Sequence, residues 1–295
     1  MVKIVLLLII VLNGIFAFKF IRDIISHKNE TFKEPGNNIF LSLWSSILFF
    51  LSTFGVSDFA LSMVAYRKTK IVNDKKLPGT LNVQCVIPVA VMSLAYISVI
   101  KVDPLTLISC ILAQVVGAYI GPRFVAKLQA RTIRLFMTAG LFAAALFILA
   151  GKFNIISTAG TATGLSGWKL VVAVLALFIY GALNNIGIGS YAPTMATVYA
   201  LGMSPAVAFP IMMGACTFSV PVGSMEFIRL GDYNRKIPMF TSTLGVVGVL
   251  VAVYIVKSLN MSMIQWVVVV VILYTAVSML INEIKSKKIK VQAQS

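Results

Sequence analysis

The chain is poor in charge, and poorer still in acidic residues. Only 12% of its 295 residues are charged, with 9 aspartates and glutamates against 25 lysines and arginines. Soluble domains carry roughly twice that fraction of charge. No polar stretch is long enough to fold as a separate soluble domain. These shortages exclude an ordinary soluble protein and indicate one integral membrane domain over residues 1–295.

Histidine and cysteine are also scarce, which limits the available chemistry. His27 is the only histidine and lies in a polar stretch, so Ser57 has no histidine beside it to act as a base. The three cysteines, Cys85, Cys110 and Cys216, lie inside apolar runs and match no metal site or disulfide framework. The sequence has no nucleotide-binding loop and no haem signature. We therefore expect no enzyme activity, no metal and no cofactor.

The net charge of +16 does not by itself indicate nucleic-acid binding. The basic residues form short clusters next to apolar runs. Membrane proteins show their orientation in this way, because lysine and arginine collect in cytoplasmic loops. We expect the lipid bilayer as a partner, and no nucleic acid.

Apolar residues make up 59% of the chain and form runs of about 20 residues, each long enough to cross about 30 Å of hydrocarbon. The first run begins like a signal peptide, but no cleavage site follows, so we expect an uncleaved helix. The runs are 2–21, 39–66, 78–100, 104–122, 131–151, 168–201, 204–228, 237–257 and 262–281.

Two of these runs, 39–66 and 168–201, exceed the length of one crossing. If every run crosses once, the basic residues divide almost evenly between the two sides, 14 against 11. If the two long runs are re-entrant hairpins, the division becomes 20 against 5. The second division is the bias that the positive-inside rule expects. We therefore predict seven crossings and two hairpins, with a long tilted helix as the alternative for each hairpin.

Hairpins at these places put the two halves of the chain in opposite orientations. We predict an all-α, polytopic integral membrane fold with an N-terminal helix and loop at 2–38 and a basic cytoplasmic tail at 284–295. Between them lie repeat 1 at 39–151 and repeat 2 at 168–283, each a broken hairpin followed by three transmembrane helices. Such inverted repeats are typical of secondary transporters, whose site lies between the halves.

A duplicated motif marks the middle of each hairpin. Gly55-Val56-Ser57-Asp58-Phe59-Ala60-Leu61-Ser62-Met63 is echoed by Gly187-Ile188-Gly189-Ser190-Tyr191-Ala192-Pro193-Thr194-Met195. Pro88 and Pro221 stand at similar distances beyond the two copies, 33 residues after Gly55 and 34 residues after Gly187. Glycine tolerates the strained backbone of a break, and a helix that begins after the break points free N–H groups at an anion. Close packing of helices through small residues is the alternative interpretation.

Polar side chains gather at the same two breaks. Hydroxyl and amide groups there can donate to the oxygens of an anion, although hydrogen bonds between helices are an alternative use for them. The predicted substrate-binding residues are Thr53, Gly55, Ser57, Asn184, Asn185, Gly187, Gly189, Ser190 and Thr194.

Asp58 is the only acid within the repeated motif, and its counterpart is Ser190. An ionisable residue inside the membrane is a functional candidate by default. Desolvation favours the neutral form of a carboxyl group, so we predict that Asp58 takes and releases a coupling proton. A cap for the second helix of the hairpin is the alternative role. Glu226 can pair with Arg229 at the surface.

The layout resembles the sulfite exporter family of the TauE/SafE type. The resemblance rests on a glycine-rich motif early in each half, a proline-bearing second helix, and the stretch from Gly117 through Gly121 and Leu128 to Arg131 and Arg134. It covers about residues 39 to 283. It implies a bacterial cytoplasmic-membrane permease for sulfite, sulfonates or related organic anions. The acid at position 58 and the added N-terminal helix depart from the family pattern.

The sequence therefore predicts a permease that moves a small anion such as sulfite or a sulfonate by alternating access, with possible proton coupling through Asp58. One rival is a transporter of a cation or amino acid that uses Asp58 as a direct ligand. A second rival is an intramembrane lipid-processing enzyme, which would need clustered acids, arginine or histidine at the hairpin tips. The oligomeric state stays open, with a homodimer as one option.

Overall fold

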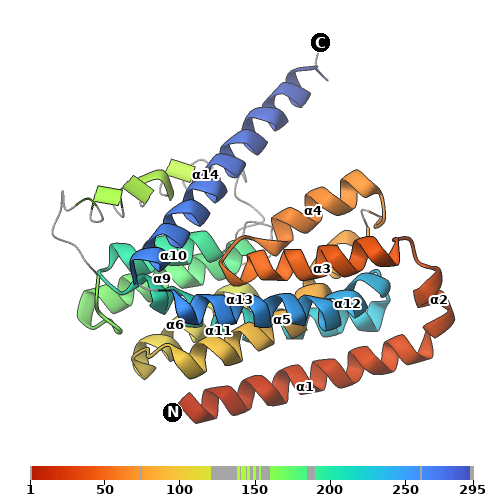
Figure 1. Ribbon diagram of the computed structural model, residues 1–295, viewed down its shortest axis with the longest axis horizontal. Coiled ribbons are helices and arrows are strands. Elements are labelled where there is room, and N and C mark those ends of the chain that lie inside the picture. The colour runs from red at the N-terminus through yellow and green to blue at the C-terminus, as the bar shows by residue number, and fades with distance from the viewer. Residues whose placement is uncertain are drawn as a thin grey trace.

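The computed structural model describes residues 2–73, 75–120, 138–139, 141–143, 145–146, 149–150, 153, 160–184, 190–259 and 261–292. Every regular element in these residues is a helix (Figure 1). The first half contains α1 (Val2–Ser26), α2 (Lys28–Lys33), α3 (Asn38–Thr53), α4 (Asp58–Thr69), α5 (Leu77–Val99) and α6 (Pro104–Ile120). The second half contains α9 (Gly167–Asn184), α10 (Tyr191–Ala200), η1 (Pro205–Val207), α11 (Ala208–Leu230), α12 (Lys236–Phe240), the π-helical turn η2 (Thr241–Gly245), α13 (Val246–Ser258) and α14 (Met261–Gln292).

Four helical stretches of the described residues are long and apolar enough to cross a bilayer. They are Val2–Ser26, Leu77–Val99, Pro205–Leu230 and Lys236–Val256. The outer face of α1 exposes large apolar side chains such as Leu7 and Phe18, which suits contact with lipid. The predicted all-helical, multi-pass membrane protein is thus confirmed at this level. Most of the predicted run 131–151 lies outside the described residues.

The run 39–66 is broken where the glycine motif predicts a break. Asn37 caps α3 by accepting a hydrogen bond from the Ile39 N–H at 2.8 Å, and α3 ends at Thr53. Gly55 then adopts a φ of +95°, a conformation that favours glycine. After it, Ser57 caps α4 by accepting a hydrogen bond from the Ala60 N–H at 3.3 Å. Two helices with a turn between them therefore replace one long helix.

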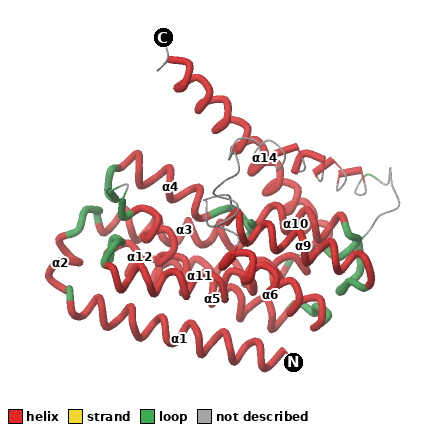
Figure 2. Tube along the Cα trace, turned by 180° about the vertical axis from the view of Figure 1, so that it is seen from behind, coloured by secondary structure: helices red, strands yellow, loops and turns green. Residues whose placement is uncertain are grey.

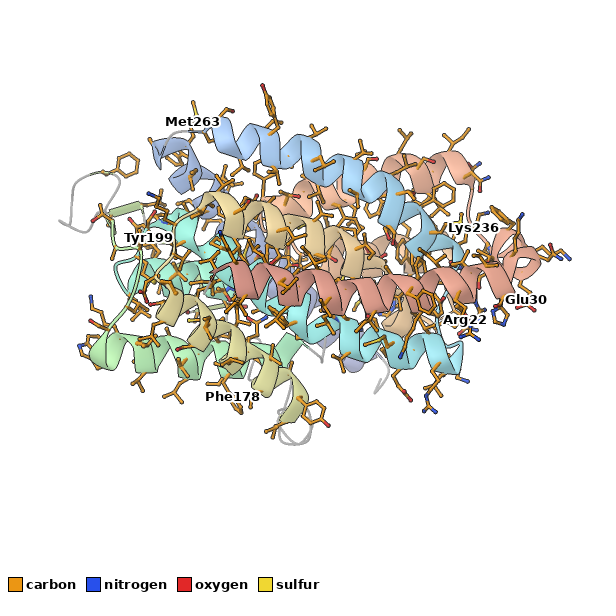
Figure 3. The ribbon with its side chains drawn as sticks, turned by 90° about the horizontal axis from the view of Figure 1, so that it is seen from below. Arg22, Glu30, Phe178, Tyr199, Lys236 and Met263 are labelled. Atoms are coloured by element: carbon orange, nitrogen blue, oxygen red, sulfur yellow. The ribbon has the colours of Figure 1, made fainter. Side chains whose placement is uncertain are left out.

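The outer ends of α3 and α4 lie at the same end of the molecule. Lys76 forms an ion pair with Glu34 at 3.7 Å, so the segment that follows α4 returns to the segment that precedes α3. Asp23 at the end of α1 binds Arg235, with 2.7 Å between Oδ2 and Nε. We call this the Glu34 end. Figure 3 shows Arg22, Glu30 and Lys236 gathered there, with Tyr199 toward the opposite end.

The opposite end, the Thr163 end, holds both outer ends of α9 and α10. The N–H of Ser204 donates to Ala162 O at 2.8 Å, and Lys169 donates to Leu201 O at 3.1 Å. The N–H of Asp103, between α5 and α6, donates to Thr163 O at 2.9 Å. The run 168–201 therefore also turns back, from the end opposite to that of the first hairpin. Figure 2 shows α3 with α4 and α9 with α10 at opposite ends of the bundle.

Two close helix contacts hold the hairpins against the rest of the molecule. A Cβ at Gly117 on α6 would collide with Phe178 O on α9, and a Cβ at Gly248 on α13 would collide with Ser46 O on α3. Only glycine lets the backbones approach this closely, as is common between membrane helices. Helices α5 and α11 pack against each other between these pairs and form the centre of the bundle.

Candidate functional site

The starts of α4 and α10, the second helices of the two hairpins, meet at a small cavity in the middle of the bundle. Its walls come from the start of α4, the start of α10 and the proline-containing parts of α5 and α11. The lining residues are Ser57, Asp58, Phe59, Cys85, Val89, Ser190, Tyr191, Cys216 and Val220. The fold thus brings together residues that are up to 163 positions apart in the sequence, because α4 and α10 both begin at the cavity.

The cavity is nearly closed in this structure. The space open to the centre of a water-sized molecule is about 10 Å³, which is close to the minimum that one water needs. Any molecule larger than one water would need the walls to move apart in order to bind there.

Asp58 is the first residue of α4, and its carboxyl group lies against the cavity. The side chain is 2% exposed. Ser52 donates a long hydrogen bond of 3.4 Å from Oγ to Asp58 Oδ1, while Oδ2 has no partner among the described residues. The capping hydrogen bond of α4 comes from Ser57, so the alternative role of Asp58 as the cap is not what the structure shows.

Gly55 allows the first break to touch the second hairpin. A Cβ at position 55 would collide with the terminal methyl group of Met195 on α10 and approach Met212 on α11. Ser57 lines the cavity beside Asp58. Of the residues predicted in the first hairpin, Gly55 and Ser57 therefore lie at the meeting point.

Thr53, also predicted to bind substrate, uses its hydroxyl and carbonyl groups in hydrogen bonds within the protein. Its hydroxyl donates to Phe49 O at 2.6 Å within α3, and its carbonyl accepts a hydrogen bond from the Tyr96 hydroxyl at 2.8 Å. Thr53 is not among the residues that line the cavity. It holds the end of α3 against α5 at the edge of the break.

At the second break, Ser190 and Tyr191 form the wall opposite Asp58. Ser190 precedes α10 and makes no capping hydrogen bond through its side chain. Its hydroxyl lies 3.9 Å from Cys216 Sγ. Thr194 is fully buried one turn into α10, and its Oγ1 has no partner among the described residues.

The remaining predicted residues of this break cannot be placed. Asn184 is the last residue of α9, and its side chain is not described. Asn185, Gly187 and Gly189 lie outside the described residues. Their predicted role in binding stays a prediction.

Two cavity residues, Cys85 and Cys216, were not among the binding residues predicted from the sequence. Both are buried, and both thiols face the cavity from opposite halves of the chain. Gln114 on α6 donates to Cys216 Sγ at 3.5 Å. The sequence could have indicated this position, because each cysteine lies shortly before a helix-breaking proline: Cys85 three residues before Pro88, and Cys216 five residues before Pro221.

The described residues offer no group of three or more histidine, cysteine, aspartate or glutamate side chains that could hold a metal ion. Glu226 is an exposed residue that pairs with Arg229 at 2.9 Å, as expected for a surface pair. The chemistry at the centre is therefore that of one carboxyl group, hydroxyl groups, thiols and helix N-termini.

Comparison with known proteins adds no assignment to this arrangement. No family model matches the chain, and neither the curated proteins nor the solved structures contain a match.

Proposed function

We propose that the chain is a secondary transporter of the bacterial cytoplasmic membrane that moves a small anion, such as sulfite or a sulfonate, by alternating access. The observation that carries the proposal is the central cavity, where the first residues of two short helices from opposite ends of the molecule meet. The resemblance to the sulfite exporter family supports the proposed substrate class, and the position of the cavity supports the proposed place of binding.

Matched contacts in the two halves support an inverted repeat. Gly117 and Gly248 stand 131 positions apart, and the carbonyls that they approach, on Phe178 and Ser46, stand 132 positions apart. Thus α6 meets α9 as α13 meets α3. The two motif glycines, Gly55 and Gly187, stand 132 positions apart as well. These spacings support a repeat in which α3 to α6 correspond to α9 to α13, with the two hairpins opening toward opposite ends, as alternating access requires.

The difference between the two repeats supports an anionic substrate. In repeat 1 the carboxyl group of Asp58 sits at the start of α4, where the positive end of a helix favours negative charge. In repeat 2 the same position is Ser190, and no acid occurs in residues 185–195 at the start of α10. The chain thus supplies its own carboxyl group at one helix start and leaves the other to a small oxyanion.

We expect proton coupling because these two helix starts share one small cavity. Asp58 and Ser190 line the same small cavity, so an ionised carboxyl group would repel an anion bound beside α10. Protonation of Asp58 removes that repulsion. Anion binding and proton uptake therefore favour each other, and the two would cross together.

A second candidate is a transporter of a cation or amino acid in which Asp58 binds positive charge directly. Among the described residues, Oδ2 of Asp58 has no partner and no lysine, arginine or histidine lines the cavity, and both observations favour this candidate. The two candidates differ in the sign of the charge that the cavity accepts.

Flux into sealed proteoliposomes separates the candidates. Purified protein is reconstituted and tested with sulfite, sulfoacetate, taurine and a series of primary amines, under an imposed pH gradient. The proposal expects flux of sulfite or sulfoacetate and competition between them. Flux of amines alone would replace the anion proposal with the cation candidate. Absence of flux for every compound, from protein that elutes as a single folded species, would contradict transport of these classes.

A further inference from the structure

The first helix, α1, lies outside both repeats, yet it reaches the central helices with a buried polar side chain. Asn13 is 5% exposed in the apolar middle part of α1. Its Nδ2 lies 2.9 Å from Ile9 O on its own helix, and it reaches α11, where it lies 3.3 Å from the carbonyl oxygen of Thr217 and 3.1 Å from Thr217 Oγ1. A carboxamide buried among apolar side chains is costly unless it is bonded, so this contact needs a physical reason.

The reason lies four residues further along α11. Proline has no N–H, so Pro221 cannot donate to the carbonyl of Thr217, which loses its helical hydrogen bond. Asn13 supplies the missing donor. It therefore binds the carbonyl that the proline leaves free, at the place where α11 is weakest.

In α5, which like α11 has a proline in its interior, a side chain from a neighbouring helix also binds the free carbonyl. Pro88 leaves the carbonyl of Gln84 on α5 without its helical donor. Thr241 Oγ1 donates to Gln84 O at 2.7 Å. Thr241 is the first residue of the π-helical turn η2, in the helix that packs beside α5. Each free carbonyl is thus bonded by a side chain from a neighbouring helix.

Both bonds lie directly beside the cavity. Cys85 follows Gln84 on α5, Cys216 precedes Thr217 on α11, and both thiols line the cavity. We propose that Asn13 is a positioning residue that holds the proline break of α11 so that Cys216 and Val220 form one wall of the central site, with Thr241 acting in the same way on α5. The inference about Asn13 deepens the proposed function, and its transport measurement rests on that function. Its structural measurement, the reactivity of the two thiols, does not depend on the proposed function.

The thiols themselves provide that structural readout. One background keeps only Cys216, through Cys85→Ala and Cys110→Ala, and the other keeps only Cys85, through Cys110→Ala and Cys216→Ala. The rate of reaction with N-ethylmaleimide is measured in both. Because the net value of one hydrogen bond corresponds to about fivefold in an equilibrium, Asn13→Leu is expected to raise the rate at Cys216 by about fivefold and leave Cys85 within about twofold. Thr241→Val is expected to do the reverse.

A crossed result of this kind distinguishes positioning from general loosening of the fold. Asn13→Gln keeps the carboxamide and is expected to restore a slow rate at Cys216, and Asn13→Ala replaces Asn13→Leu if the larger side chain prevents folding. Equal changes at both thiols, or no change at either, would overturn the proposal. In proteoliposomes that show anion flux, Asn13→Leu is expected to raise KM more than it lowers kcat. Absence of flux in the unsubstituted protein bears on the proposed function and leaves the thiol result intact.

Discussion

At the scale of single residues, the central site depends on a few groups whose neighbours come from distant parts of the chain. Asp58 is buried with one oxygen unpartnered among the described residues, and Gly55 holds the break that lets α4 begin at the cavity. The break at Gly55 was predictable from the local sequence, but its contacts with Met195 on α10 and Met212 on α11 were not, because those residues lie more than 100 positions away.

Asp58→Asn should uncouple flux from the pH gradient. The amide cannot take up or release a proton, while its shape and hydrogen-bonding capacity remain close to those of a neutral carboxyl group. We expect anion exchange to persist and the response to an imposed pH gradient to be lost, measured as initial flux with and without the gradient. Glu226→Gln, at an exposed surface pair, is the control and should keep the response. An unchanged response in Asp58→Asn would contradict the role of Asp58 in proton coupling.

Gly55→Ala should destabilise the protein more than the matched change at Gly167. Both glycines have positive φ, +95° at Gly55 and +56° at Gly167, so each alanine carries conformational strain of about 1–2 kcal/mol. Only at Gly55 would the new Cβ also collide with Met195, since nothing lies within 4 Å at Gly167. We expect a lower Tm for Gly55→Ala in detergent than for Gly167→Ala. Equal Tm values would contradict a tight contact between Gly55 and Met195 on α10.

At the scale of elements, the two hairpins are held by equivalent glycine contacts on α6 and α13. Substitution at either contact should therefore have the same effect. Gly117→Ala and Gly248→Ala each place a methyl group against a backbone carbonyl, which cannot move aside as a side chain can. Overpacking of this kind costs about 1–3 kcal/mol.

We expect both variants to lose a similar share of folded protein, measured by fluorescence-detected size-exclusion chromatography after mild heating. Gly14→Ala on α1 is the control, because no atom lies within 4 Å of a Cβ there. It should be neutral or slightly stabilising, since alanine favours a helix over glycine by about 1 kcal/mol. A large effect at only one of the two contacts would argue against equivalent packing.

Much of this element-level layout was predictable from the sequence, because it follows from length and repetition. Runs too long for one crossing, with Gly55 in the middle of the first, predicted a break that the structure places at residues 54–57. The role of Thr53 and the cavity position of Cys85 and Cys216 were missed. Helix rotation decides which side chains face the cavity, and rotation depends on packing partners more than 100 residues away.

At the scale of the whole molecule, the proposed central site requires two hairpins that enter from opposite ends of the bundle and meet in the middle. Figure 3 shows the Glu34 end with Arg22, Glu30 and Lys236, and the contacts of Thr163 define the Thr163 end. The uneven division of lysine and arginine predicts that the Glu34 end faces the cytoplasm. Helix α1 then runs the length of the bundle and binds α11 at its centre through Asn13.

Cysteine labelling from each side of the membrane tests this arrangement most directly. Single cysteines are placed at exposed positions that flank the hairpins, Glu30→Cys and Lys68→Cys for the first, Thr163→Cys and Ala200→Cys for the second, in a protein with its three native cysteines changed to alanine. A membrane-impermeant thiol reagent should react with the second pair on intact cells and with the first pair only on inside-out vesicles. Reaction of the two members of either pair from different sides would contradict the hairpins and the central site together.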